Sequence, residues 1–323
     1  MTFNREVLAG LLYPNLLYAD AISPDARERM LYLQSEMASP MGAYSGNSKG
    51  EEVIRKSIAK YIEKRDGDKV SVDPNRIYLT NGASEGVRQA FKLLLRDQLD
   101  GVMVPIPQYP LYSALLKLEG ATLVKYYLDE EKHWGVDVAD MEKRIKDAKD
   151  LGINIRAMTV INPGNPTGQV LRRGDIENMI KIAHEHRMVI LADEVYQANI
   201  YGDVPFTSFR KVLAELGEPY ASNVELISLH TVSKGLMGEC GLRGGYMETH
   251  NLDAFTEEML YKVKSIELCA NTVGQVATHL MVQPPTLGVE SESCVEQYNR
   301  EKDKIMSGLK ERAKLLTETF NSM

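Results

Sequence analysis

Hydrophobic and polar positions follow two different periods along residues 50–248. Apolar side chains recur every three or four positions over residues 51–66, which predicts an amphipathic helix that ends at Gly67. Short apolar runs predict strands over residues 76–80, 101–105, 122–128, 155–161, 188–192, 224–229 and 244–248. Helical spacing predicts helices over residues 85–95, 141–148, 175–185, 251–268 and 294–320.

This alternation predicts an α/β fold with a mostly parallel central sheet and helices on both faces. Residues 1–48 contain short helical patterns and no strand pattern, so we expect an N-terminal arm and part of a small domain there. Residues 49–290 form the expected large domain, and residues 291–323 form a long, charged helix. Ligands of such sheets bind beyond the carboxyl ends of the strands.

Composition narrows the function class but not the fold. The 323 residues carry a net charge of −7 and no long run of Lys or Arg, which argues against a nucleic-acid partner. No apolar run reaches membrane-spanning length, so we expect no membrane partner. Three widely spaced cysteines indicate a reducing compartment, the cytoplasm or an organelle matrix. Small-molecule chemistry is the class that remains.

The turn between residues 80 and 85 is a candidate anion site. Ala83 and Ser84 stand where a strand gives way to a helix, and free N–H groups at a helix N-terminus attract anions. Alone, Ser84 would be read as a plain helix cap. Arg243 lies in a glycine-rich segment and could bind a phosphate through two N–H groups, although such arginines more often form surface ion pairs.

Two further strand ends carry polar side chains. The string NPGNPTG, residues 162–168, forces an irregular backbone that projects the Asn165 amide into the crevice. Asp193 and Glu194 follow the apolar strand MVILA, with Tyr196 close behind. A carboxylate at the mouth of a buried strand needs a cation, such as a protonated pyridine nitrogen. A metal is the competing partner, but the neighbourhood offers no His or Cys ligands, so we expect no metal site.

Lys234 is the candidate nucleophile. It follows Ser233 just after a predicted buried strand, and a lysine held there near cationic groups is expected to have a lowered pKa and to react with a carbonyl. Tyr109 follows another strand end and could lay its ring on a flat cofactor, or serve as a core residue.

Taken in order, these motifs resemble those of the fold-type I pyridoxal-phosphate-dependent aminotransferases, and most closely the alanine aminotransferase (glutamate–pyruvate transaminase) subfamily. The resemblance covers about residues 3–320. It is carried by GAYSGNSKG, TNGASEGV, PIPQYPLYSALLKLEGA, YYLDEEKHWGVDV, VINPGNPTGQVL, LADEVYQANIY and HTVSKGLMGECGLRGGY.

The resemblance implies a pyridoxal 5′-phosphate cofactor bound covalently to Lys234, with Asp193 at its ring nitrogen. It implies that Tyr196 and Asn165 hold the ring hydroxyl and that Tyr109 stacks on the ring. It implies phosphate ligands from Ala83, Ser84, Ser233 and Arg243, and from Tyr44 of a neighbouring subunit, hence a homodimer. The implied reaction is ping-pong transfer of an amino group between L-alanine and 2-oxoglutarate, with Lys234, Asp193 and Tyr196 as catalytic residues.

The chain departs from the family pattern at both ends. Members continue beyond the position of Met323 into a C-terminal small domain that supplies the arginine for the substrate carboxylate, and they carry an N-terminal turn that closes over the substrate. We therefore expect a chain without that small domain. A catalytically weak or silent cofactor-binding or interaction homologue, and a lyase of the same fold, remain alternatives.

Overall fold

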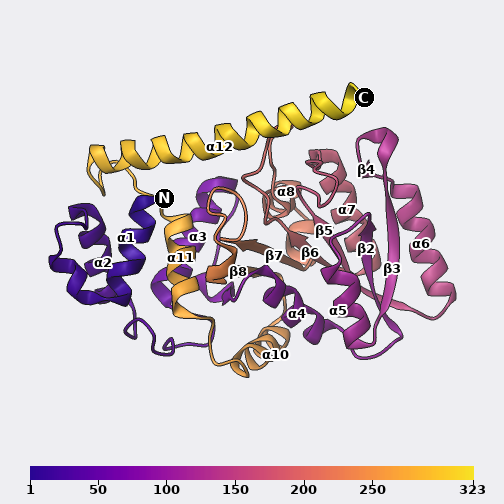
Figure 1. The fold of residues 1–323 in the computed structure, drawn as a ribbon. Helices are drawn as coiled ribbons and strands as arrows, with labels where there is room; N and C mark the ends of the chain where they lie inside the picture. The colour runs from indigo at the N-terminus through magenta and orange to yellow at the C-terminus, as the bar shows by residue number, and fades with distance from the viewer.

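The protein is built around one eight-stranded sheet with the strand order β1-β8-β7-β6-β5-β2-β3-β4 (Figure 1). The structure is a computed structural model that describes residues 1–323. The strands are β1 (Ile77–Thr80), β2 (Asp100–Ile106), β3 (Thr122–Asp129), β4 (Gly135–Val136), β5 (Asn154–Ile161), β6 (Val189–Asp193), β7 (Leu226–Thr231) and β8 (Gly245–His250).

The sheet is mostly parallel, as the alternating pattern predicts. Strands β3, β2, β5, β6 and β7 pair in parallel, whereas β8 runs antiparallel between β7 and β1, and β4 pairs antiparallel to β3. Asp193 at the end of β6 is in register with Ile161 of β5 and with Leu229 of β7. The carboxyl ends of these three strands therefore lie side by side.

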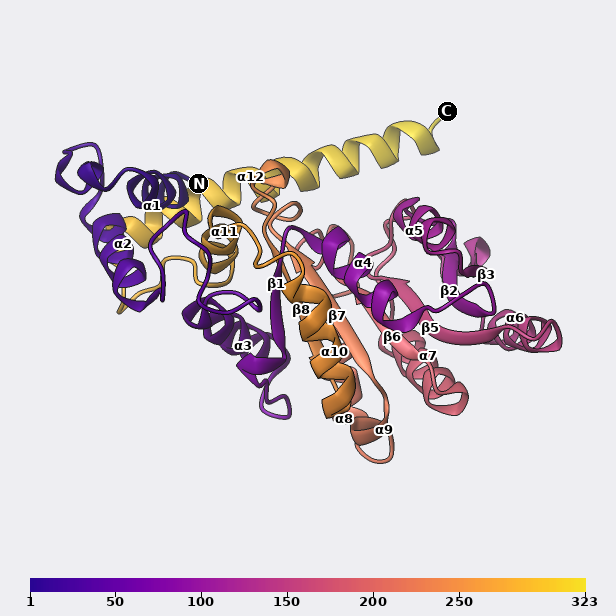
Figure 2. The ribbon, with the colours of Figure 1, turned by 90° about the horizontal axis from the view of Figure 1, so that it is seen from below.

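Helices cover both faces of the sheet (Figure 2). The helices are α1 (Thr2–Leu12), α2 (Pro24–Glu36), α3 (Glu52–Asp66), α4 (Ala83–Leu94), α5 (Leu111–Glu119), α6 (Val138–Asp150), α7 (Arg173–His186), α8 (Phe209–Leu216), α9 (Tyr220–Asn223), α10 (Ala254–Ser265), α11 (Thr272–Val282) and α12 (Glu292–Asn321), with 3-10 turns at Pro14–Tyr18, Pro74–Arg76, Glu130–Lys132 and Cys240–Leu242.

Two of the three hydrophobic cores lie on opposite faces of the sheet because successive strand residues point to opposite sides. In β6, Leu191 belongs to the core formed with α4, α5 and α10, whereas Ile190 and Ala192 belong to the core formed with α6, α7 and α8. Both faces of the central strands β6 and β7 are buried, which explains why apolar residues stand at successive positions in these strands.

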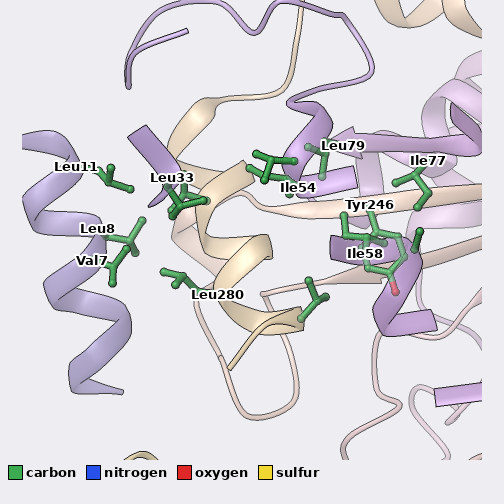
Figure 3. Close-up of a cluster of buried hydrophobic side chains, with 14 of the residues drawn as sticks. Val7, Leu8, Leu11, Leu33, Ile54, Ile58, Ile77, Leu79, Tyr246 and Leu280 are labelled. Carbon is green, nitrogen blue, oxygen red and sulfur yellow. The ribbon is translucent and has the colours of Figure 1, made fainter. Parts of the chain in front are cut away.

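The third core joins the N-terminal helices to one end of the sheet. Figure 3 shows Val7 and Leu8 of α1 beside Leu280 of α11, with Ile58 of α3 and Tyr246 of β8 further along the same cluster. The first 33 residues thus share a hydrophobic core with β1, α3 and α11.

Helix α12 runs along the outside of the molecule (Figure 1). Tyr298 is its one fully buried side chain, and Leu315, Leu316 and Phe320 near its end are exposed. No helix of the structure combines the length and the apolar character needed to cross a membrane.

The sequence pattern finds every strand but β4 and misses four helices, α5, α8, α9 and α11. Helix α11 shows the physical reason most clearly, because nine of its eleven residues are buried, among them Gln275, Thr278 and His279. A helix enclosed on nearly all sides shows no alternation between an apolar and a polar face.

Candidate active site

A cavity of about 230 Å³ lies beyond the carboxyl ends of β5, β6 and β7. Nine of the ten predicted site residues line it, and we call it the Lys234 pocket. These nine are Ala83, Ser84, Tyr109, Asn165, Asp193, Tyr196, Ser233, Lys234 and Arg243. They come from six separate segments of the chain, which the parallel sheet brings to one edge.

One end of the pocket is an anion cradle. Helix α4 begins here, and no side chain caps its N-terminus. Arg243 extends one Nη2 to the backbone oxygen of Asn81 (2.8 Å) and to the Ser84 hydroxyl (3.3 Å). Gly82 adopts a φ of +86°, and a Cβ at this position would lie 2.6 Å from Arg243 Nη2. The close approach of the guanidinium therefore requires glycine.

Ser233 lines the same pocket as this cradle. Its hydroxyl accepts a hydrogen bond from Thr231 Oγ1 at 3.0 Å, and Thr231 also lines the pocket. Free helix N–H groups, two hydroxyls and one guanidinium together suit a phosphate. Sequence reasoning missed Thr231, which is the last residue of β7 and lies two positions beyond the end of the predicted strand.

Lys234 lines the pocket, with its Nζ 5.2 Å from the centre of the Tyr196 ring. The expected lowering of its pKa is wrong for this structure. A hydrogen bond with the Tyr196 hydroxyl raises the pKa of Lys234 above its usual value, and this effect outweighs partial burial. A hydroxyl partner stabilises the ammonium form, and no neighbouring cation offsets it.

Asp193 is a buried carboxylate in the wall of the pocket and is 7% exposed. It accepts hydrogen bonds from the Tyr112 hydroxyl at 2.5 Å and from the Val195 N–H at 3.4 Å. Burial raises the pKa of Asp193, because desolvation exceeds the effect of these donors and of Lys234. Tyr112 was not predicted as a site residue; its only signal is its position three residues after Tyr109.

Two more side chains complete the walls. The Asn165 amide donates to the Tyr196 hydroxyl at 3.3 Å, so Tyr196 is held between Asn165 and Lys234. Tyr109 is 46% exposed and presents its ring to the pocket rather than to a core. Tyr44 is 70% exposed and lies outside the pocket.

Metal ligands converge elsewhere. The one group of three His, Cys, Asp or Glu side chains whose ligand atoms lie within 4.8 Å of one another is Glu142, Glu185 and His186, on α6 and α7. None of them lines the Lys234 pocket.

Residues 15–322 match the family described as aminotransferase class I and II. The chain belongs to this family. It is 46% identical to glutamate–glyoxylate aminotransferase 1 of Arabidopsis thaliana over 327 residues, covering 100% of this chain and 67% of that protein. It is 45% identical to alanine aminotransferase 1 of Homo sapiens over 326 residues, covering 99% of this chain and 64% of that protein.

Solved aminotransferase structures share the fold. Alanine aminotransferase from Pyrococcus furiosus superposes with a TM-score of 0.74 at 25% identity, covering 100% of this chain and 77% of that one. Aspartate aminotransferase from Thermotoga maritima superposes with a TM-score of 0.71 at 24% identity, covering 93% of this chain and 69% of that one. The chain thus spans about two thirds of the length of the relatives it matches.

The cofactor of this family is pyridoxal 5′-phosphate, and the Lys234 pocket fits it. Its donor set suits the molecule, because one cavity combines an anion cradle at Ser84 and Arg243, an amine at Lys234 and a buried carboxylate at Asp193. The glycine that the cradle needs is present at position 82.

Proposed function

We propose that this chain is an aminotransferase that moves an amino group between L-alanine and 2-oxoglutarate, giving pyruvate and L-glutamate. The observation that carries the proposal is the convergence of nine predicted residues in one pocket around Lys234. The names of the matched alanine aminotransferases support the choice of substrates. Residues 49–290 act in this proposal as the cofactor-binding domain.

Each pocket residue takes one task. The N–H groups of Ala83 and Ser84, with Ser233 and Arg243, bind the phosphate. The Asp193 carboxylate would hold the protonated ring nitrogen, a cation that would stabilise the ionised form of the carboxyl group. The remaining three side chains would orient the ring, Tyr109 by stacking and Asn165 and Tyr196 by binding its hydroxyl.

Lys234 performs the amine and proton chemistry. Pyridoxal phosphate, when bound, supplies an electron sink for the charge that develops on the substrate Cα. Lys234 would hold the cofactor through its Nζ. Once the substrate amine has displaced it, the free Nζ would take the Cα proton as a general base and return it to the cofactor as a general acid. The Tyr196 hydroxyl, its hydrogen-bond partner, stabilises the lysine while Nζ carries the proton.

The complete site would be shared between two copies of the chain. Tyr44 lies on the connection after α2 with its side chain largely exposed, which leaves it free to reach the phosphate of a neighbouring subunit. Sedimentation of the cofactor-loaded chain should give a dimer, and a loaded monomer would remove this part of the proposal.

A reducing compartment suits the chain. Its three cysteines form no disulfide, which supports the cytoplasm or an organelle matrix as the site of action. Fractionation of cells that express the chain tests this assignment.

A direct assay of amino transfer tests the function. The chain, loaded with pyridoxal phosphate, should form pyruvate from L-alanine and L-glutamate from 2-oxoglutarate in equal amounts. Lys234→Ala should abolish both products, whereas Lys262→Ala, a change of an exposed lysine on α10, should leave the rate unchanged. A loaded chain that forms neither product would instead be a silent cofactor-binding homologue.

A second amino acceptor belongs in the same assay. Two Arabidopsis relatives at 46% identity are named glutamate–glyoxylate aminotransferases, so glyoxylate is a second candidate acceptor. The ratio of kcat/KM for glyoxylate to that for 2-oxoglutarate decides between the two.

A further inference from the structure

A fully buried lysine stands directly behind the anion cradle. Lys264 of α10 is 0% exposed, and its Nζ lies 2.6 Å from Oε1 of Glu85, which is 6% exposed. Glu85 belongs to the first turn of α4, the helix whose N-terminus forms the cradle. Helix α10 packs along α4, so it delivers Lys264 to this point from 179 residues further along the chain.

Glu85 also holds the loop that precedes α4. Its Oε2 accepts a hydrogen bond from the Asn81 N–H, and its Oε1 accepts a second one from Gln89 Nε2 at 2.6 Å. Asn81 in turn accepts hydrogen bonds from Arg243 Nη2 on its backbone oxygen and from Asn271 on its side-chain oxygen. The carboxylate of Glu85 is therefore linked to the arginine of the cradle through one residue, Asn81, by two hydrogen bonds.

The charge of Glu85 opposes the binding of a phosphate. A helix N-terminus attracts an anion through its free N–H groups. A carboxylate in the first turn is attracted by the same positive potential and repels a second anion bound there. Burial alone would raise the pKa of Glu85, but Lys264 and its hydrogen-bond partners bring it below its usual value, so the carboxylate is ionised. Without a counter-charge, a negative group would stand directly behind the bound phosphate.

Lys264 supplies that counter-charge. A second ion pair, Arg88 with Glu267, lies beside it, so each acidic side chain of this cluster has a basic partner. Burial and the neighbouring Glu85 raise the pKa of Glu267, so this side chain adds no stronger negative charge than Arg88 offsets. A neutral cluster leaves the N-terminus of α4, Ser84 and Arg243 as the net positive end of the pocket.

We infer that Lys264 is a positioning residue for the cofactor phosphate: by pairing with Glu85 it fixes Asn81 and cancels the negative charge behind the cradle. The inference rests on the proposed function, since it assumes that the Lys234 pocket binds pyridoxal phosphate. It assigns a role in cofactor binding to a residue outside the pocket.

The test compares a cofactor with its phosphate-free analogue. Dissociation constants for pyridoxal phosphate and for pyridoxal are measured by absorbance titration of the unchanged chain, Lys264→Met and Lys262→Met. Lys264→Met should weaken pyridoxal phosphate binding at least tenfold, which corresponds to about 1.4 kcal/mol, and should leave pyridoxal binding unchanged. Lys262→Met makes the same change on the exposed side of α10 and should alter neither constant.

A double variant separates charge from packing. Glu85→Gln combined with Lys264→Met removes both charges and should restore most of the affinity for pyridoxal phosphate. If Lys264→Met does not fold, Glu85→Gln alone can test the inference. Removal of the negative charge should tighten the binding of pyridoxal phosphate severalfold and leave the binding of pyridoxal unaffected.

The outcomes distinguish the inference from the function on which it rests. An unchanged chain that binds no pyridoxal phosphate overturns both. An unchanged chain that binds it, with equal losses for both ligands in Lys264→Met, makes Lys264 a purely structural residue and overturns the inference alone.

Discussion

Asp193 and Glu194 are adjacent carboxylates at the end of β6, and they belong to two different regions of the molecule. Asp193 opens into the Lys234 pocket, whereas Glu194 points to the opposite face of the sheet. There Glu194 accepts the Phe209 N–H at 2.8 Å and lies 3.9 Å from Arg65. We call this second region the Arg65 network; its members are Tyr61, Arg65, Asp66, Glu194, Gln197 and His230.

The burial and the pKa shifts of the two carboxylates do not distinguish the two regions. Both carboxylates are less than 10% exposed, and burial raises the pKa of both, that of Glu194 to about 8. The surroundings differ instead. Asp193 shares a cavity with a lysine and an anion cradle, whereas Glu194 is enclosed by side chains that already bind one another. A perturbed carboxylate indicates a functional site only when space and complementary groups accompany it.

Exchanging each carboxylate for its amide should give opposite results, and this is the largest expected effect. Asp193→Asn should slow amino transfer by about 100-fold or more, because the charge at the ring nitrogen is lost. Glu194→Gln should keep the rate within about threefold of that of the unchanged chain, since Glu194 lies on the other face of the sheet from the pocket. Steady-state rates of the two variants give the comparison, and equal losses would show that both regions serve the chemistry.

Arg65→Met tests the structural role of the network. Arg65 binds both oxygens of Asp66, at 2.8 and 2.6 Å, and the Asp66 side chain is 2% exposed. Loss of the arginine leaves a buried carboxylate without a partner and should reduce the free energy of unfolding by about 3 kcal/mol. Urea unfolding of the unchanged chain and of Arg65→Met measures this loss of free energy. A difference below about 1 kcal/mol would mean that the network adds little stability.

The raised pKa of Glu194 predicts a smaller, pH-dependent effect. Between its ordinary pKa of 4.5 and about 8, the folded chain binds a proton that the unfolded chain releases, so this group's contribution to stability is full at low pH and lost as pH rises. The slope approaches about 1.4 kcal/mol per pH unit. Glu194→Gln should flatten the decline in unfolding free energy from pH 5 to 8, and an unchanged slope would contradict the assignment.

Tyr196→Phe should have the smallest effect, a shift in a pH profile. The Tyr196 hydroxyl raises the pKa of Lys234, so the free amine forms only at high pH in the unchanged chain. Without the hydroxyl, the rate at which Lys234 captures pyridoxal phosphate should begin to rise at a lower pH. Stopped-flow absorbance from pH 7 to 11 measures this rate. A profile shifted to higher pH would show that the Tyr196 hydroxyl does not raise the pKa of Lys234.

The sequence alone is sufficient to predict seven of the eight strands and nine lining residues of the pocket, because both rest on local signals. Apolar runs mark the strands, and motifs such as NPGNPTG and the segment around Lys234 mark their carboxyl ends. The rest depends on contacts between distant segments. Tyr112 reaches Asp193 across 81 positions, and Lys264 reaches Glu85 across 179. The raised pKa of Lys234 likewise follows from a tyrosine 38 positions away, which no local pattern reveals.

The central claim is that the pocket residues form a covalent cofactor site around one lysine. The most direct test is to incubate the chain with pyridoxal phosphate, reduce it with borohydride and locate the modified lysine by peptide mass mapping. We expect one modified residue, Lys234, and no pocket-specific modification in Lys234→Ala. Modification spread evenly over the surface lysines, and equal in Lys234→Ala, would contradict the claim.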